Sequence, residues 1–415
     1  MSRHQHSSTG FVIGTVSLAH FLSHFYFLVF PPLFPLFRAE FDVSNTQLGL
    51  LFSLLFFMPS ILQLPVGDLV DRIGAKRVFV AGIAVTGVGV MATTLANSYP
   101  ALLAFALLAG VGQSVFHPAD FALIETVTDE TTRGKGFGTH TFAGFLGFAA
   151  GPLIAGGLGI RYGWRPALLA LGSIGVVYAV AVLLTMAPVH RGRELGDGSP
   201  GADEDENDDG GGLLSNWALL LDPRILATFA FFVLLTVSST GIQSFTVVFL
   251  TDVFDLSNAV ANTTLTANLT ATAVGVLAGG VLADRLNIYA ILVGTLAVAC
   301  ALTGVIVAGV LPSTLVITLG LFVVLGFAHG LALPSRDSLV SEFSTSDSTG
   351  KSFGFAYTGV TVGAAVAPVM FGVVSDTVNN VAMYSLVGVF YAAAVLTVVL
   401  LYVRFVRVRP EPAVG

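Results

Sequence analysis

Three polar side chains stand at helical spacing within one apolar stretch of the chain. Gln113, His117 and Asp120 are four and three residues apart, so they would share one face of a helix. A group that can ionise is costly inside a membrane and usually faces a cavity or a charged partner. We therefore expect Asp120 to carry a proton. The alternative is a purely structural polar pair between Asp120 and His117.

Two histidines form a second candidate site nearer the start of the chain. His20 and His24 lie one helical turn apart on a stripe that also holds Ser17. Such a pair can bind a metal ion, but only His117 is placed to join it from another apolar stretch. We expect these imidazoles to line a cavity and to contact protons or substrate; packed neutral histidines and a metal site are the alternatives. No metal or other cofactor is predicted, and His140 is expected to serve helix packing.

Polar candidates are fewer in the second half of the chain. Gln243 shares a polar helical face with Ser239, and His329 precedes Arg336 and Asp337 in another apolar stretch. We expect Gln243 and His329 to line the substrate cavity. Arg336 and Asp337 are expected to mark the membrane edge. The alternative is that these two residues pair across a gate.

The elements that must position these residues are membrane-spanning helices. The 415 residues are 54% hydrophobic and 10% charged, with a mean hydropathy of +0.86, whereas soluble domains carry about 25% charged residues. The single cysteine, Cys300, excludes a disulfide framework. Twelve apolar runs approach the ~20 residues that cross a bilayer. The predicted spans are 11–37, 48–66, 78–95, 101–124, 137–160, 166–186, 225–250, 259–281, 289–310, 314–333, 353–374 and 381–405.

The distribution of charge predicts the orientation of these spans. If both termini are cytoplasmic, the loops on the opposite side hold Arg38, Arg161 and Arg165, and the remaining 15 of the 18 Lys and Arg lie on or near the cytoplasmic side. The acidic, glycine-rich segment 188–216 is too polar to bury and is predicted to be a disordered cytoplasmic linker. The polar N-terminus has no cleavage site before the first span, so no removable signal peptide is expected.

Local sequence patterns recur in the two halves of the chain. Residues 41–45 (Phe-Asp-Val-Ser-Asn) return 213 residues later as 254–258 (Phe-Asp-Leu-Ser-Asn). We therefore predict an all-α membrane protein with two pseudo-symmetric six-helix bundles, 11–187 and 217–407. Transporters built from such repeats bind their substrate near the bilayer midplane, between the halves, and rock around it.

A short charged segment, residues 67–77, separates the second and third runs. Its sequence, Gly-Asp-Leu-Val-Asp-Arg-Ile-Gly-Ala-Lys-Arg, has a reduced copy at 280–287. The pattern resembles the loop signature of the major facilitator superfamily, with Ala75 at a position that is usually basic. The resemblance implies a cytoplasmic gate in which Asp71 contacts the start of the eleventh helix, near 348–351, and stabilises the outward-facing state. The residues of this gating motif would be Gly67, Asp71, Arg72, Gly74, Lys76, Arg77, Arg133, Asp284 and Arg285.

The fifth run carries a glycine motif. Its small residues fall on one helical stripe, which lets another helix approach backbone to backbone. The pattern resembles the fifth-helix signature of drug/proton antiporters of the same superfamily, with Ala155 in place of a glycine; generic small-residue packing is the alternative. Segments 116–118 (Phe-His-Pro) and 139–142 (Thr-His-Thr-Phe) resemble the fosmidomycin-resistance-type branch, which implies proton-driven efflux of a small molecule. The helix-packing residues are Gly138, Gly147, Gly151, Pro152 and Gly156.

These features predict a secondary transporter and not an enzyme. No lysine lies mid-membrane to anchor a retinal, and 348–352, which ends like a phosphate-binding loop, lacks the glycine required at 345. The main hypothesis is a proton-coupled antiporter that exports a small, partly apolar molecule by alternating access. Uptake of an organic anion or metabolite, by symport or facilitated diffusion, is the alternative. The expected partners are this molecule, protons and the lipid bilayer of the cell membrane, with no nucleic acid, and the chain is expected to be a monomer.

Overall fold

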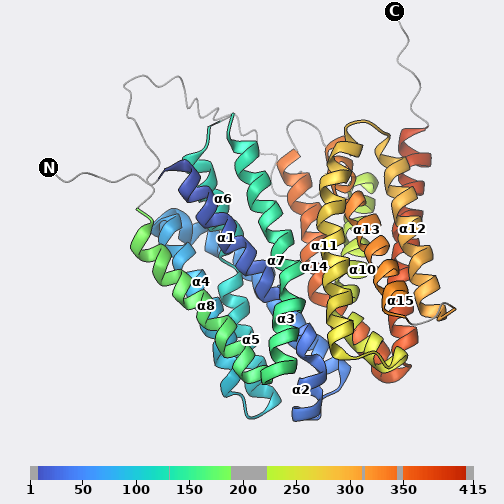
Figure 1. The fold of residues 1–415 in the computed structure, drawn as a ribbon. Helices are drawn as coiled ribbons and strands as arrows, with labels where there is room; N and C mark the ends of the chain where they lie inside the picture. The colour runs from blue at the N-terminus through green and yellow to red at the C-terminus, as the bar shows by residue number, and fades with distance from the viewer. Residues whose placement is uncertain (1–7, 130, 188–221, 311–313, 344–348, 408–415) are drawn as a thin grey trace, which may run out of the picture.

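Helical spans form two bundles that stand side by side (Figure 1). The computed structural model describes residues 8–129, 131–187, 222–310, 314–343 and 349–407. At Leu64 and at 349–353 it describes the backbone alone. Within these residues, twelve segments are long and apolar enough to cross a membrane, which confirms the predicted number of spans. The predicted linker, 188–216, lies outside the described residues.

The N-terminal bundle holds helices α1 to α8 and the C-terminal bundle holds α10 to α15 (Figure 1). The first comprises α1 (Thr9–Phe27), η1 (Pro31–Leu33), α2 (Phe34–Phe41), α3 (Asn45–Ile73), α4 (Ala75–Ala92), η2 (Thr93–Leu95), α5 (Tyr99–Gln113), α6 (Phe116–Val127), α7 (Arg133–Tyr162) and α8 (Trp164–Thr185). The second comprises α10 (Pro223–Phe254), α11 (Asn258–Ala283), α12 (Ile288–Ala308), α13 (Leu315–Phe343), α14 (Thr349–Thr377), α15 (Asn380–Leu401) and η4 (Tyr402–Val406). The first and last described residues lie at one end of the molecule, here termed the terminal end, and α2 lies at the opposite end, termed the α2 end.

Two of the spans are interrupted helices. The first consists of α1, η1 and α2, because Pro31 and Pro32 lack the amide hydrogens that a continuing helix needs. The fourth consists of α5 and α6, which separate at Ser114 and Val115. The amides of these two residues donate to carbonyls three residues back, at 3.3 Å. The single helix expected over 101–124 is therefore two helices, and the break falls within the first candidate site.

The repeated Phe-Asp-x-Ser-Asn pattern forms the same turn in both halves. Asp42 ends α2 and Asp255 ends α10, each in the left-handed region, with φ of 50° and 53°. Aspartate is one of the few residues that tolerate this conformation. Two residues later, Ser44 and Ser257 begin the next helices, and each hydroxyl accepts a hydrogen bond from the amide three residues on. The shared geometry supports the internal repeat inferred from the sequence.

Glycines of α7 let this helix pack directly on α1. A Cβ added at Gly144 would lie 2.6 Å from Cε1 of His20, and one added at Gly147 would overlap the backbone carbonyl of Phe21. A Cβ at Gly151 would likewise lie 2.9 Å from the side chain of Leu28, the residue that follows α1. These contacts are too short for any larger residue, so the glycine stripe is a helix-packing surface.

The mutation Gly147→Val is expected to destabilise the folded protein by about 3 kcal/mol, because the obstacle is a fixed backbone and overpacking typically costs 1–3 kcal/mol. The predicted packing role of Gly138 is wrong, because a Cβ added there meets nothing within 4 Å. Gly138→Val is therefore the matched control on the same helix. The midpoint of thermal unfolding in detergent measures the difference. Equal midpoints for the two variants would show that the stripe is not tightly packed.

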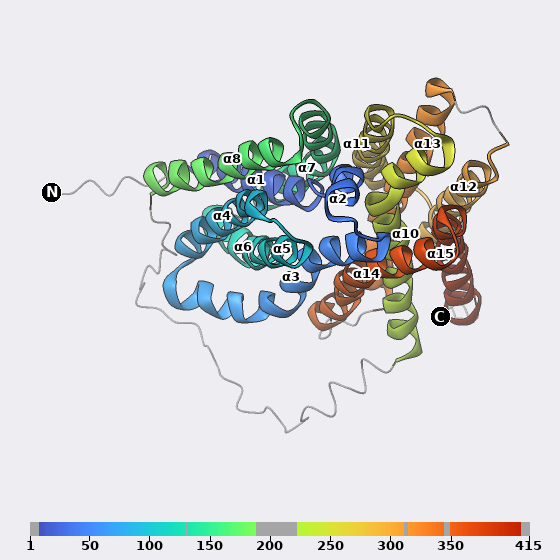
Figure 2. The same cartoon turned by 90° about the horizontal axis from the view of Figure 1, so that it is seen from below.

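The two halves contact each other at the α2 end, where α3 packs on α14 and α7 packs on α11 (Figure 2). Gly49 lies against the backbone carbonyl of Pro368, and a Cβ added at Gly372 would lie 2.5 Å from the carbonyl oxygen of Asn45. Gly156 of α7 packs on α11 with the same closeness. The interface between the halves therefore depends on backbone approaching backbone.

A polar network fastens this end of the interface. The Asp376 carboxylate of α14 accepts hydrogen bonds from the backbone amides of Asn45 and Thr46, at 3.0 and 2.8 Å, and from the Thr46 hydroxyl, at 2.6 Å. These amides begin α3, where a negative charge is favourable. Arg38 donates to Asp252 of α10 at 2.7 Å. The residues of this α2-end network are Arg38, Asn45, Thr46, Asp252, Ser375 and Asp376.

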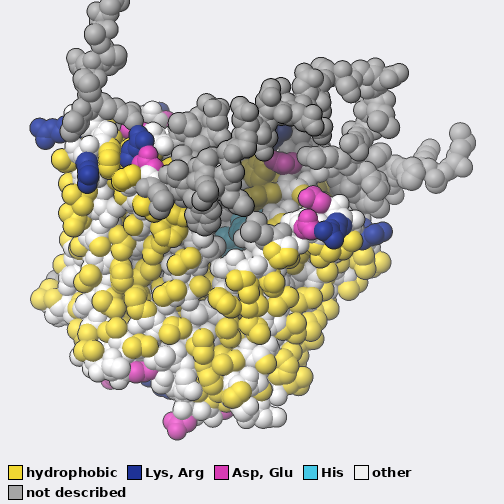
Figure 3. Space-filling model, turned by 180° about the vertical axis from the view of Figure 1, so that it is seen from behind, with side chains coloured by type: hydrophobic (Ala, Val, Ile, Leu, Met, Phe, Trp, Pro, Cys, Tyr) yellow, Lys and Arg dark blue, Asp and Glu magenta, His cyan; other side chains and the backbone are white. Residues whose placement is uncertain are grey.

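At the terminal end, the described residues of the two halves form no hydrogen bond or ion pair with each other. Between described residues, the hydrogen bonds and ion pairs that join the halves lie at the α2 end. At the terminal end Asp68 and Arg72 pair with each other at 2.6 Å, and their side chains are 64% and 74% exposed. Figure 3 shows a hollow between the halves on this side, with a histidine side chain visible inside it.

Candidate functional site

The buried carboxylate of Asp120 is the centre of the candidate site. The side chain is 0% exposed on α6, and its Oδ2 lies 2.9 Å from Nε2 of His140 on α7. Its Oδ1 has no hydrogen-bond partner among the described residues. Buried polar atoms in folded proteins are nearly always paired, so this oxygen marks the carboxylate as a candidate functional group.

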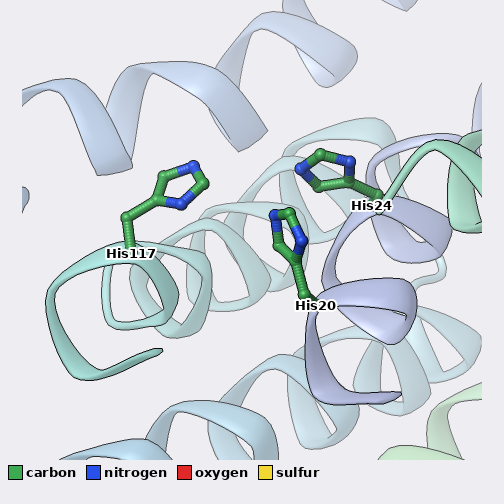
Figure 4. Close-up of side chains that lie close together, drawn as sticks. All are labelled: His20, His24 and His117. Carbon is green, nitrogen blue, oxygen red and sulfur yellow. The ribbon is translucent and has the colours of Figure 1, made fainter. Parts of the chain in front are cut away.

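His140 connects Asp120 to the histidines of α1. Its ring stacks on that of His20, with centroids 3.8 Å apart and planes 4° from parallel. The His20 ring centroid lies 4.2 Å from that of His24 and 5.6 Å from that of His117. Figure 4 shows His20 and His24 projecting from α1 toward His117 on α6. These five side chains form one group, termed the histidine–aspartate cluster.

The backbone of His140 also fixes the tautomer of His20. The carbonyl oxygen of His140 lies 2.8 Å from Nδ1 of His20. A carbonyl can only accept, so Nδ1 of His20 carries the hydrogen and, in the neutral ring, Nε2 is a bare acceptor. That Nε2 has no hydrogen-bond partner within the described part of the chain, and neither has Nδ1 of His24.

The structure brings the predicted N-terminal site residues together but pairs them differently. His20, His24, His117 and Asp120 all lie in the cluster. The partner of Asp120 is His140 and not His117. Sequence reasoning missed His140, which it assigned to helix packing; the available signal was an ionisable residue inside an apolar run.

Gln113 fastens α5 to α1 and stands apart from the cluster. Its side-chain oxygen accepts a hydrogen bond from the Ser23 hydroxyl at 2.7 Å, and its side-chain nitrogen donates to the Ser23 carbonyl at 2.8 Å. Both side chains are buried. This reciprocal pair fixes α1, and therefore its histidines, relative to the break between α5 and α6.

The predicted cavity residues of the second half do not form a comparable group. His329 is buried on α13, with Nδ1 3.0 Å from the hydroxyl of Tyr391 on α15. Gln243 is half-buried on α10. Arg336 pairs with its neighbour Asp337 at 2.8 Å, so among the described residues it forms no ion pair with the other half.

The predicted gating residues are spread over the terminal end. Gly74 joins α3 to α4 with a φ of 93°, which glycine adopts without strain. The Lys76 ammonium donates to the carbonyl of Met186 and so ties α4 to the end of α8. The predicted contact of Asp71 with 348–351 involves side chains outside the described part. Exposed residues at this end are Asp71, Arg77, Arg133, Asp284 and Arg285.

Comparison with known proteins identifies the architecture. A family model described as the Major Facilitator Superfamily matches residues 16–368 and 229–415. The chain belongs to the Major Facilitator Superfamily. A solved structure of this fold, described as a bacterial homolog to the human lysosomal transporter Spinster in an inward-facing and unoccupied conformation, has a TM-score of 0.79 at 17% identity. The match covers 98% of this chain and 99% of that chain, and it shows the fold.

Relatives within the Major Facilitator Superfamily carry both efflux and anion-transport names. The fosmidomycin resistance protein of Escherichia coli (strain K12) is 25% identical over 421 residues, 94% of this chain and 92% of that protein. The multidrug resistance protein MdtG of Yersinia enterocolitica is 31% identical over 162 residues, 38% of this chain and 39% of that protein. The probable sulfoacetate transporter SauU of Cupriavidus necator is 27% identical over 166 residues, 40% of this chain and 38% of that protein. The resemblance to the fosmidomycin-resistance branch is confirmed, and the chain is a multi-pass membrane transporter and not an enzyme.

Proposed function

We propose that this transporter is a proton-coupled antiporter that exports a small, partly apolar molecule, with Asp120 as the proton carrier. The observation that carries the proposal is the fully buried Asp120 carboxylate, bonded to His140 through one oxygen and unpaired at the other among the described residues. A charge in such a place is costly, so the group either takes up a proton or meets a new partner when its surroundings change.

A route for the proton leads from the hollow to the carboxylate. His117 is the exposed member of the cluster, and the rings of His117, His20 and His140 follow one another toward Asp120. With both termini in the cytoplasm of the cell, the terminal end and its hollow face the cytoplasm. Coupling follows if proton and substrate bias the same rocking equilibrium by different amounts.

The surroundings of the cluster favour a partly apolar substrate. The Phe148 ring centroid lies 4.1 Å from that of His24, and Phe27 stacks on Phe56 at 4.4 Å beside it. Pockets for small molecules typically combine aromatic walls with a few polar groups that fix orientation. The names of two relatives, fosmidomycin resistance protein and multidrug resistance protein, support export.

Uptake of an organic anion is the second candidate. A face rich in imidazoles suits an anionic substrate, and one partial relative is named a probable sulfoacetate transporter. Under this alternative the molecule moves in the same direction as the proton, or independently of it. The direction of substrate flux relative to proton flux therefore separates the two candidates.

Flux in proteoliposomes tests the proposal. The purified chain is reconstituted, a pH gradient is imposed, and movement of fosmidomycin, other drugs and small organic anions is followed. Antiport predicts that at least one compound moves against the proton flow, about tenfold faster than after the gradient is collapsed. Flux that persists unchanged after collapse would show uniport, and movement along with protons would show symport.

Asp71→Asn is expected to slow transport about 2- to 30-fold without lowering the amount of inserted protein. A carboxylate at a helix N-terminus contributes roughly 0.3–2 kcal/mol, and its loss would destabilise the form in which the terminal end is closed. Asp129→Asn is the control, because Asp129 is an exposed acid of the same end whose side chain, among the described residues, bonds to its neighbours Thr131 and Thr132. Transport by Asp71→Asn at the rate of the control would count against the proposed contact of Asp71 with the start of the eleventh helix.

A further inference from the structure

Three imidazoles from two helices converge on one point beside the proton site. His20 and His24 project from α1, and His117 projects from α6 (Figure 4). One ring nitrogen of each lies within 4.8 Å of one ring nitrogen of each of the others. The reciprocal bonds between Gln113 and Ser23 fix α1 against the end of α5, next to the break that precedes α6.

Two of these imidazoles present a buried nitrogen that has no hydrogen-bond partner among the described residues. Nε2 of His20 and Nδ1 of His24 are buried and unpaired among the described residues. The bond from Nδ1 of His20 to the carbonyl of His140 fixes the ring and its tautomer. Imidazoles that ligate a metal almost always donate their other N–H to a carbonyl or a carboxylate in this way.

We propose that His20, His24 and His117 bind a divalent first-row transition-metal ion such as Zn²⁺. Three imidazoles suit Zn²⁺, Ni²⁺, Co²⁺ and Cu²⁺, whereas Mg²⁺ and Ca²⁺ prefer oxygen ligands. A tetrahedral ion with Zn–N bonds of 2.0–2.1 Å holds its ligand nitrogens about 3.3 Å apart, so small side-chain rotations close the site.

The surroundings give this ion an entry path and an open position. His117 is exposed while His20 is buried, so the ion enters from the side of His117. His140 lies outside the group of three whose nitrogens are within 4.8 Å of one another, and its Nε2 bonds to Asp120. A site with three protein ligands keeps its fourth position for water or another small ligand. The ion would cross-link α1 to α6, next to the break in the fourth span.

Cobalt binding to the full-length protein tests the site directly. Tetrahedral Co²⁺ gives strong visible absorption bands, whereas the bands of octahedral Co²⁺ in water are weak. The parent protein carries no affinity tag and has His4, His6 and His190, which lie outside the described residues, replaced by Gln. We expect one equivalent of Co²⁺ to bind, Zn²⁺ to displace it, and Zn²⁺ to raise the midpoint of thermal unfolding.

Matched variants separate this site from other histidines and from proton coupling. His117→Ala and the double variant His20→Ala/His24→Ala should each lower the affinity for Co²⁺ at least ~10-fold, while His329→Ala, a buried histidine of the other half, should not. Asp120→Asn should still bind Co²⁺, so the site stands even if the proton proposal fails. Absence of both the cobalt bands and the Zn²⁺ stabilisation in the parent would overturn the proposal. Bands that survive in the combined variant His20→Ala/His24→Ala/His117→Ala would also overturn it.

Discussion

Asp120→Asn is expected to lower gradient-driven transport at least ~100-fold, the range typical when a positioned proton-transfer group is removed. Asparagine has nearly the same shape and retains a hydrogen-bonding group for His140 at 2.9 Å, but it cannot release a proton. The variant should therefore fold and insert normally. Initial rates in proteoliposomes under an imposed pH gradient measure the loss.

Exchange of substrate across the membrane without a gradient should persist in Asp120→Asn, because the substrate site and the rocking motion remain. Asp129→Asn is the matched control. Hydrogen bonds from the side chains of Thr131 and Thr132 lower the pKa of Asp129 to about 2, so this carboxylate stays charged and takes up no proton at working pH. Gradient-driven transport by Asp120→Asn at the rate of this control would contradict the assignment.

Asp376→Ala is expected to shift the population toward forms open at the α2 end by about 5- to 30-fold. The mutation removes three hydrogen bonds from α3 to a carboxylate, at 3.0, 2.8 and 2.6 Å. Hydrogen bonds to charged groups contribute ~1.5–3 kcal/mol when buried, and exposure of Asp376 reduces the combined effect to roughly 1–2 kcal/mol. Gly49 and Gly372 would still allow the halves to meet.

Distances between spin labels measure this shift. Leu95 and Val378 are 70% and 63% exposed on opposite halves at the α2 end, so cysteines there accept labels in a Cys300→Ala background. Asp376→Ala should increase the long-distance population of this pair. Thr377→Ala is the control, because the Thr377 hydroxyl bonds to its own helix at 2.7 Å. An unchanged distribution in Asp376→Ala would show that the network does not hold this end closed.

The spans and the repeat were predictable because their signals are local. Hydropathy over ~20 residues gives a helix long enough to cross a bilayer, and Asp42 and Asp255 repeat one turn because each lies in the same short pattern. Close packing by the α7 glycines was also predictable, since small residues at helical spacing have few other uses in a membrane.

The pairing of the site residues was less predictable because it depends on contacts between helices. The bond between Asp120 and His140 needs the packing of α6 on α7, and the sequence offers Asp120 a nearer partner in His117. The break between α5 and α6 places Gln113 on a separate helix, where it bonds to Ser23. The bonds of the α2-end network between the halves join residues 214 to 331 positions apart, which no local pattern records.

Label distances at both ends of the molecule, recorded as a function of pH, test the central claim that protonation of Asp120 drives alternating access. The second pair is Ile73, which is 43% exposed, and Gly354, where a Cβ meets nothing within 4 Å. We predict that a change in pH shifts the populations of the Ile73–Gly354 and Leu95–Val378 pairs in opposite directions, and that Asp120→Asn abolishes both shifts. Distances that respond to pH equally in the variant and the parent, or that change in the same direction at both ends, would contradict the account.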